Sequence, residues 1–298
     1  MDLSILIATV PPRQKYLNRL LVNLQNQIVE NNLQDRVEIV IYKDNFESVV
    51  GHKFNKLIES AKGKYCVLVG DDDILVDDYC ITIIKAIDEN PNVDQISHNH
   101  RYYHNNTDKF IRIKVSREYE GESLVFFNFL KCYIQKYYNN DSRNQDWEIR
   151  LNAHQFLKVF EEKEKTILKA KSNSLKMLYV LMIIKLFKKF ITVNLRHTCH
   201  TTPIKKEIFE SVKFTDRPRE QDLEWATKVY QLGLIKTECK IDKDLYYYYY
   251  NEKMSINRGK GDKMSEEEKN DKIVETNNRT IDFNWELQPI DKINIRWI

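Results

Sequence analysis

The chain has 298 residues, of which 42% are hydrophobic and 31% charged, a composition typical of a folded protein and not of a disordered chain. Only 7 glycines are present, and none falls in a G-x-x-x-x-G-K-[ST] or G-x-G-x-x-G pattern, so neither a P-loop nor a Rossmann dinucleotide turn is supported. The net charge of +3 is too small to indicate nucleic acid as the main partner. Any bound phosphate must therefore be neutralised by something other than glycine-loop amides.

The first hundred residues alternate between strand-like and helix-like patterns, as in βαβ units. Parallel strands with crossover helices are the simplest topology for this order, because each crossover needs a helix of about this length. The predicted strands are 3–10, 37–42, 65–69 and 94–98, and the predicted helices are 15–28, 51–61 and 77–87.

The pattern loosens over 101–195, where a helical segment is expected at 148–170. Helices are then predicted at 203–212 and 220–232, followed by a strand over 234–250. This strand ends in five consecutive tyrosines, which suit either a strand with two half-buried faces or a surface for stacking on a sugar or base. Residues 252–298 are charged and less periodic, and are expected to form a C-terminal tail or mobile loop.

The location expected from the sequence is cytoplasmic. Five scattered cysteines, an odd number, favour a reducing compartment over a disulfide framework. The apolar run at 3–10 has no basic flank and ends in two prolines, unlike a signal peptide. The apolar part of 174–190 is shorter than the roughly 20 residues that cross a bilayer, so no transmembrane segment is expected. A buried helix is favoured there over a basic helix in weak contact with a membrane surface.

Three adjacent carboxylates, Asp71, Asp72 and Asp73, directly follow the predicted strand 65–69. Their mutual repulsion raises their pKa values unless something compensates the charge. A divalent cation would do so, and oxygen ligands suit Mg²⁺ or Mn²⁺. Ligands of open α/β sheets also bind at the carboxyl ends of strands. The alternative is a solvated acidic turn that caps the next helix, and the triplet alone leaves both interpretations open.

The segment from Ser48 to Asp73 resembles the nucleotide-sugar half of GT-A glycosyltransferases of the family 2 type. Members commonly show G-x-K-R-N, then A-x-G-x-Y, and a strand that ends in D-x-D or D-D-D. The opening from Ser4 to Arg13 also resembles such enzymes, especially those of phages and viruses. Phe54 departs from the pattern, because an arginine is usual there. The residues that fall in register are Gly51, Lys53, Asn55, Ala61, Gly63 and Tyr65.

A second block, 200–209 and 219–226, resembles the family elements H-x-x-P-I-K-x-E-I and E-D-x-D-W. Alignment on Trp225 places Asp222 at the aspartate of the E-D pair and Gln221 at its glutamate. In the family this aspartate is the general base that deprotonates the acceptor hydroxyl in an inverting transfer. The resemblance covers roughly residues 3 to 90 and 197 to 251.

The resemblance implies an α/β fold of the GT-A type with a mixed central sheet over 1–251. Its parts would be a nucleotide-sugar half at 1–100, an insertion at 101–195 and an acceptor half at 196–251. The implied reaction moves a sugar from a nucleotide-diphosphate donor, with a UDP-sugar favoured, and uses Mn²⁺ or Mg²⁺. This suits the chemistry, which needs a cation for the diphosphate leaving group and a base for the nucleophile.

The implied site residues fall into three groups. They are Thr9, Arg13, Asp44, Lys53, Asp71 and Asp72 for the nucleotide sugar, Asp71, Asp73 and His200 for the metal, and Asp222 as the catalytic base. A structural role for His200 and a turn role for Asp44 are the alternatives. The acceptor, whether protein, glycan, lipid-linked glycan or modified DNA, is left open. A nucleotidyltransferase and a degenerate domain that acts as a binding or assembly module are the rival functions.

Overall fold

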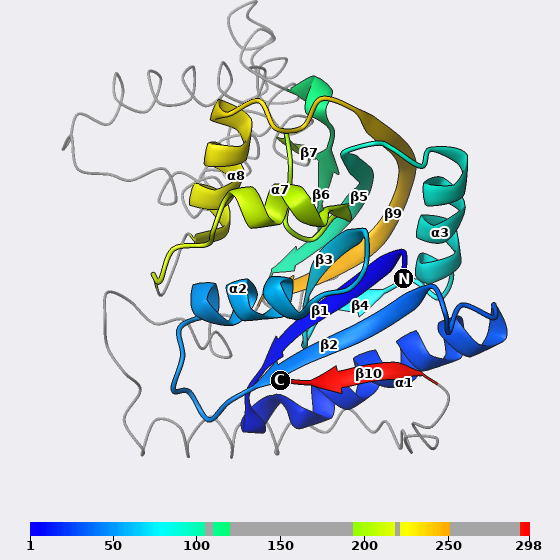
Figure 1. Cartoon of the computed structure of the whole chain (residues 1–298), viewed down its shortest axis with the longest axis vertical. Coiled ribbons are helices and arrows are strands. Elements are labelled where there is room, and N and C mark those ends of the chain that lie inside the picture. The colour runs from blue at the N-terminus through cyan, green and yellow to red at the C-terminus, as the bar shows by residue number, and fades with distance from the viewer. Residues whose placement is uncertain (105–109, 120–192, 218–220, 251–292) are drawn as a thin grey trace, which may run out of the picture.

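The computed structural model describes residues 1–104, 110–119, 193–217, 221–250 and 293–298 (Figure 1). The expected helical segments 148–170 and 174–190 lie outside the described residues. Within the described ranges, no helix is long and apolar enough to cross a membrane.

One mixed sheet organises the described part of the chain, with strand order β10-β2-β1-β3-β8-β5-β6-β7 and with β9 pairing with β5 and β4. The strands are β1 Leu3–Thr9, β2 Val37–Lys43, β3 Tyr65–Gly70, β4 Ile74–Leu75, β5 Gln95–His104, β6 Phe110–Val115, β7 Val193–Arg196, β8 Ile204–Lys205, β9 Glu238–Tyr250 and β10 Asn294–Trp297. The helices are α1 Gln14–Glu30, α2 Val50–Ser60, α3 Tyr79–Glu89, α7 Lys206–Ser211 and α8 Gln221–Gln231, and short 3-10 turns lie at Pro11–Arg13 and Arg117–Tyr119.

The N-terminal half has the predicted parallel topology. β1 runs parallel to both β2 and β3, and α1 and α2 make the crossovers between them. Antiparallel pairing enters further along the chain, where β8 pairs with β3 and β6 pairs with β5. The predicted α/β architecture with a mixed central sheet is therefore confirmed.

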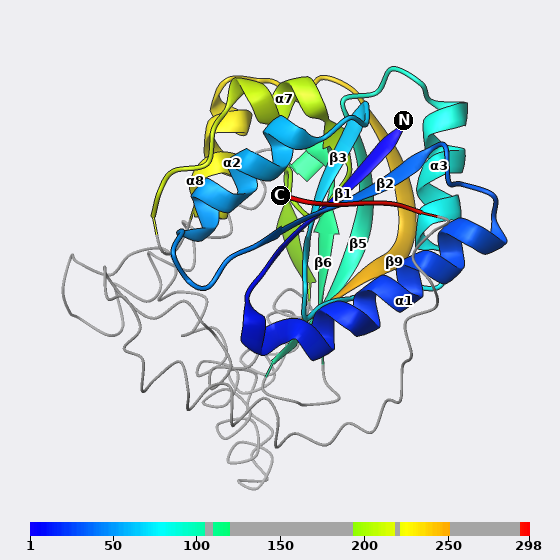
Figure 2. The ribbon, with the colours of Figure 1, turned by 60° about the horizontal axis from the view of Figure 1, so that its bottom comes forward.

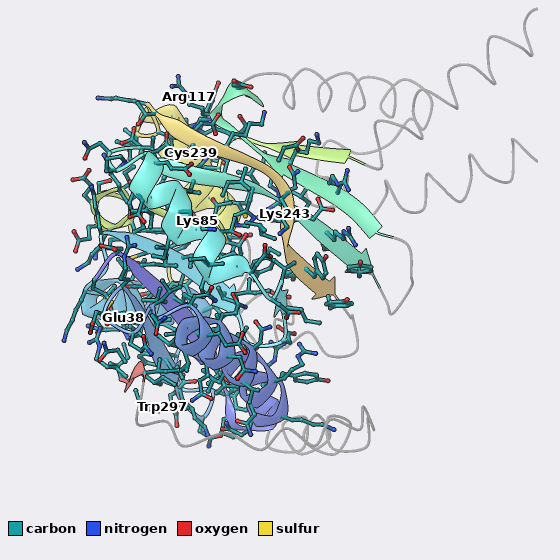
Figure 3. All side chains as sticks on the ribbon, turned by 90° about the vertical axis from the view of Figure 1, so that its right-hand side faces the viewer. Glu38, Lys85, Arg117, Cys239, Lys243 and Trp297 are labelled. Carbon is teal, nitrogen blue, oxygen red and sulfur yellow. The ribbon has the colours of Figure 1, made fainter. Side chains whose placement is uncertain are left out.

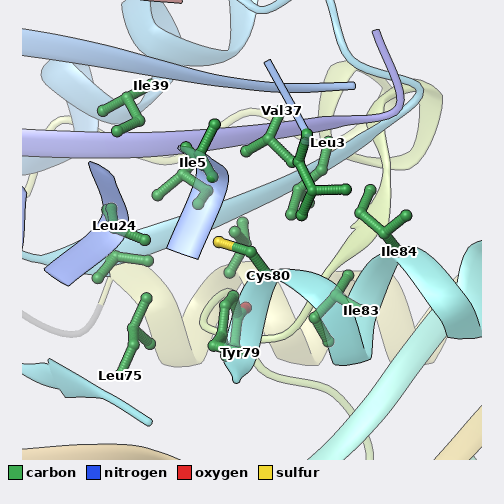
Figure 4. Close-up of a cluster of buried hydrophobic side chains, with 14 of the residues drawn as sticks. Leu3, Ile5, Leu24, Val37, Ile39, Leu75, Tyr79, Cys80, Ile83 and Ile84 are labelled. Atoms are coloured by element: carbon green, nitrogen blue, oxygen red, sulfur yellow. The ribbon is translucent and has the colours of Figure 1, made fainter. Parts of the chain in front are cut away.

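Helices cover both faces of the sheet, with α1 and α3 on one side and α2, α7 and α8 on the other (Figure 2). Ile5 and Ile7 of β1 pack in the cluster with α1 and α3, shown in Figure 4, whereas Leu6 packs in the cluster with α2, α7 and α8. Because successive side chains of a strand point to opposite faces, both faces of β1 are buried. This is why its sequence is apolar at nearly every position.

Two expectations about the C-terminal half need correction. Residues 204–205 are not helical but form β8, because their backbone pairs with β3 on one side and β5 on the other. The expected tail ends in β10, which runs parallel to β2 at the edge of the sheet. Arg296 of β10 donates to the buried Glu38 carboxylate at 2.7 Å, and this ion pair helps to fix the strand. The rest of the expected tail that precedes β10, 252–292, lies outside the described residues.

The approach of Gly63 to β1 gives a stability prediction. A Cβ at this position would lie 2.6 Å from the Ser4 nitrogen and 2.7 Å from the Leu3 carbonyl carbon. Because these are backbone atoms of a central strand, we expect Gly63→Ala to lower the free energy of unfolding by about 2 kcal/mol. Denaturant unfolding measures the change. Gly233→Asn is the control, since Gly233 has φ of +60° with open space around it and asparagine tolerates that conformation. Equal losses in the two variants would contradict the prediction.

Candidate functional site

The predicted nucleotide-sugar residues lie near the carboxyl ends of the parallel strands β1, β2 and β3. In the strand register Ala8 is paired with Gly70 and Thr9 with Lys43, so β1, β2 and β3 end at the same level. Thr9, Asp44 and Asp71 stand at or directly after these ends. Open α/β sheets bind their ligands at the carboxyl ends of their strands.

Five of the predicted residues meet where Thr9 and Arg13 contact the acidic cluster, which we define as Asp71 to Asp73. The Asp71 carboxylate accepts hydrogen bonds from Thr9 Oγ1 at 2.7 Å and from Arg13 Nη1 at 2.7 Å. The same guanidinium nitrogen lies 3.0 Å from Asp72 Oδ1. Arg13 ends the 3-10 turn after β1, which begins with two prolines that fix the backbone direction there. The loop after β1 thus places a cation against two carboxylates of the cluster.

Three further residues hold the cluster and were not among the predicted site residues. Arg19 Nη2 donates to the Asp72 carbonyl oxygen at 2.8 Å and lies 3.2 Å from that of Asp73. The Tyr246 hydroxyl donates to Asp73 Oδ2 and accepts from the Gly70 nitrogen. The Tyr249 nitrogen donates to Asp73 Oδ1 at 3.3 Å. The tyrosine run signals part of this arrangement in the sequence, whereas Arg19 looks like any other position of an amphipathic helix.

Two carboxyl groups of the cluster, those of Asp71 and Asp73, have raised pKa values. Asp71 and Asp73 are almost fully buried, and this burial raises the pKa of both carboxyl groups. At Asp71 the Arg13 guanidinium opposes the rise, whereas at Asp73 the charge of Asp72 adds to it. The protein therefore compensates the cluster partly with its own arginine.

The carboxylate oxygens of the cluster can supply only part of the coordination shell of a cation. Within the described ranges, no three or more His, Cys, Asp or Glu side chains are grouped so that they would hold a metal. The oxygens of Asp71 and Asp73 already accept protein hydrogen bonds, while the Asp72 side chain is 26% exposed. A cation here would thus take most of its ligands from water and substrate, which is common for Mg²⁺.

Asp44 and Lys53 form an ion pair with each other at the carboxyl end of β2. Lys53 is buried in the first turns of α2, and its ammonium contacts Asp44 Oδ1 just after β2. Asp44 Oδ2 also accepts from the Ser48 nitrogen at 2.8 Å. A buried ammonium needs such a partner, so the two residues predicted for the nucleotide pocket depend on one another.

Asp222 lies in the first turn of α8, within electrostatic range of Arg196 and His200. Tyr248 is within electrostatic range of Asp222 and also of Asp72 and Asp73. Arg196 was not identified from the sequence. Its Nε is buried and has no hydrogen-bond partner among the described residues.

His200 makes ring-packing contacts and a backbone hydrogen bond, neither of which involves the carboxylates predicted to bind the metal. Its ring packs against Phe54 and Phe214, with ring centroids 5.7 Å and 6.4 Å away. Its carbonyl oxygen accepts from the Leu68 nitrogen at 3.0 Å. None of these contacts is with Asp71 or Asp73, so a metal-binding role for His200 stays a prediction.

Comparison with known proteins finds no matching protein-family model and no significant match among curated proteins. Among solved structures, the chain is similar to the 1–349 fragment of Staphylococcus aureus TarS in complex with UDP-GlcNAc, with a TM-score of 0.44 and 14% identity over 85% of this chain and 59% of that one. The same fragment with UDP gives a TM-score of 0.43 and 14% identity over 85% of this chain and 62% of that one.

The chain covers 37% of the longer TarS structure, with a TM-score of 0.43 and 14% identity over 84% of this chain. It thus spans less than two thirds of the TarS chains to which it is similar.

Two buried histidines beside the cluster predict how stability depends on pH. The His98 and His100 ring centroids are 4.8 Å apart, and His100 lies 5.2 Å from Tyr246. Burial lowers the pKa of His98 to about 4, and burial followed by the charge of His98 lowers that of His100 as well. An unfolded histidine has a pKa near 6.5, so between pH 7 and pH 5 the unfolded chain takes up protons that the folded protein does not.

We therefore expect the free energy of unfolding to fall as the pH is lowered from 7 to 5, by about 2 kcal/mol from His98 alone. Urea unfolding at the two pH values measures this difference. His98→Gln should make the dependence weaker. A free energy of unfolding that is unchanged between pH 7 and pH 5 would contradict the expectation.

Proposed function

We propose that this protein is a GT-A glycosyltransferase that moves a sugar from a nucleotide-diphosphate donor to an acceptor hydroxyl. The observation that supports it best is the contact of Thr9 and Arg13 with Asp71, across 62 and 58 residues of sequence. The family resemblance assigns all three to the nucleotide sugar, and they come together near the carboxyl ends of β1 and β3, the position at which open α/β sheets commonly bind ligands.

The roles of the cluster residues follow from their charges and contacts. Arg13 pairs with two carboxylates of the cluster and is the cation we assign to the donor diphosphate, because a guanidinium matches the geometry of phosphate oxygens. Asp71, fixed by Thr9 and Arg13, is the acceptor we assign to the nucleotide ribose. Asp44 and Lys53 would meet the base and the phosphates beside it. The proposed Mn²⁺ or Mg²⁺, for which the resemblance implies Asp71, Asp73 and His200 as ligands, would supply positive charge to the leaving diphosphate.

Asp222 is the residue we assign as the catalytic base of an inverting transfer. A base must reach the acceptor hydroxyl, which attacks the sugar on the side away from the leaving group. Asp222 approaches the site from α8, whereas Arg13 and the acidic cluster approach it from the strand ends. An inverting transfer requires the donor phosphate and the base to lie on different sides of the transferred sugar.

Ligand-induced stabilisation tests this function. UDP-, GDP- and TDP-sugars are each added with and without Mn²⁺, and the shift in Tm is measured. We expect one nucleotide sugar, a UDP-sugar first, to stabilise the fold by about 2.7 kcal/mol at 100 times its Kd. Thr9→Val is the matched variant, because it keeps the size of the side chain and removes the hydroxyl that binds Asp71.

Product analysis then separates the rival functions. Slow release of sugar and nucleoside diphosphate supports a glycosyltransferase. Consumption of a nucleoside triphosphate with release of pyrophosphate would instead support a nucleotidyltransferase. No response to any nucleotide would support a binding or assembly module and would contradict the proposal.

A further inference from the structure

A pair of stacked tyrosines borders the candidate site. β5 and β9 run parallel, and their register places Tyr102 beside Tyr248. The two rings are stacked, with centroids 5.2 Å apart and planes 12° from parallel. We call this pair the tyrosine platform. Figure 3 shows β9 curving along the sheet past Cys239 and Lys243 toward the end that carries the platform.

The platform is the exposed continuation of a buried face. Side chains of a strand alternate, so Tyr246 and Tyr248 lie on the same face of β9. Tyr246 is buried and holds Asp73, whereas Tyr248 is 37% exposed. A large aromatic ring at the surface is stable in one orientation only if something holds it, and the stacked Tyr102 does so here. Because the ring is already ordered, a ligand that packs on it loses less conformational entropy.

The position of the platform indicates what it binds. Tyr246, two residues earlier on the same face of β9, holds Asp73 of the acidic cluster. Tyr248 itself is within electrostatic range of Asp72, Asp73 and Asp222, and Arg13 is also in range of Tyr248. The ring therefore lies close both to residues assigned to the donor diphosphate and to the residue assigned as base. In a transfer reaction, the acceptor occupies this space.

We infer that the tyrosine platform, through the ring of Tyr248, binds a saccharide acceptor, an inference that rests on the proposed function. One face of a pyranose ring presents C–H groups that pack on an aromatic ring, while its hydroxyls bond to nearby carboxylates. Exposed aromatic area beside a few placed polar groups is the composition of such a site. The three carboxylates near Tyr248 also disfavour a phosphodiester backbone such as that of DNA.

Saturation-transfer NMR with methyl glycosides tests the platform. The probes are methyl β-glucopyranoside, methyl β-galactopyranoside and the methyl glycoside of N-acetylglucosamine, each added to full-length protein with UDP and Mn²⁺. Glycerol is the control probe, because it has hydroxyls but no ring face. We expect at least one glycoside to receive saturation on one face of its ring and glycerol to receive none.

Three variants locate the contact. Tyr248→Phe keeps the ring and should bind the glycoside as wild type does. Tyr248→Ala should weaken binding about tenfold, which corresponds to about 1.4 kcal/mol. Tyr230→Ala is the matched control, because Tyr230 on α8 is equally exposed and should not affect binding. The Tm of each variant, measured with and without UDP, shows that the fold and the nucleotide site are intact.

Two results would overturn the inference. The first is a wild-type protein that binds no glycoside. The second is a Tyr248→Ala variant that binds the glycoside normally. If this variant also loses its affinity for UDP, the ring of Tyr248 belongs to the nucleotide pocket. Failure of the proposed function looks different, since the protein would then bind no nucleotide sugar while Tyr248 could still bind the glycoside.

Discussion

Asp222→Asn is expected to slow sugar transfer by about 10³-fold while leaving the affinity for the nucleotide sugar within about twofold. Asparagine has the shape of aspartate but cannot accept a proton from the acceptor hydroxyl. Because Asp222 lies on α8 and Arg13 and the acidic cluster lie at the strand ends, the loss of its charge leaves the donor contacts in place. The rate of nucleoside diphosphate release with acceptor, and the Kd of the donor, measure the two effects separately.

Glu224→Gln is the matched control, since Glu224 is on the same helix and its carboxylate pairs with Lys228 toward solvent. We expect this variant to keep wild-type transfer. If Glu224→Gln loses transfer and Asp222→Asn does not, the base has been assigned to the wrong carboxylate. If both variants lose donor binding, the role of α8 is structural.

Arg13→Met should lower the free energy of unfolding by about 3 kcal/mol and abolish nucleotide-sugar binding. The substitution removes the cation that pairs with Asp71 and Asp72, and a buried carboxylate without its partner is strongly destabilising. Adding Asp71→Asn to Arg13→Met should restore part of the lost stability, because the buried charge is then gone as well. It should not restore binding. Urea unfolding and donor titration of the two variants measure this.

The same variants test the predicted cation. If Mn²⁺ binds the acidic cluster, it should stabilise Arg13→Met more than the wild type, because it replaces the missing positive charge. It should not stabilise the double variant to the same degree. Stability of Arg13→Met equal to that of the wild type would show that the ion pair contributes little.

The first half of the fold was predictable because its signals are local. The runs 3–10, 37–42 and 65–69 are apolar at nearly every position, and the helices between them repeat at helical spacing. The structure places β1, β2 and β3 within a residue or two of these runs. A buried parallel strand must be apolar on both faces, so its sequence alone identifies it.

The short and distant strands were not predictable in this way. β4 and β8 have two residues each, too few for any periodicity, and β10 has four residues at the end of a charged segment. Their conformation is decided by the backbone of the strands beside them. For the same reason the predicted helix over 203–212 begins only at Lys206.

By itself, the sequence determined the parallel βαβ order and the placement of three carboxylates directly after a strand. Both depend on residues that are close in the chain. Only the tertiary structure decided that Arg13 pairs with Asp71, that Tyr246 holds Asp73 from a strand 173 residues away, and that Asp222 lies within electrostatic range of the same tyrosine as the cluster. These contacts join segments that are far apart in the sequence. Their proximity is set by sheet register and helix packing, so no local sequence pattern predicts it.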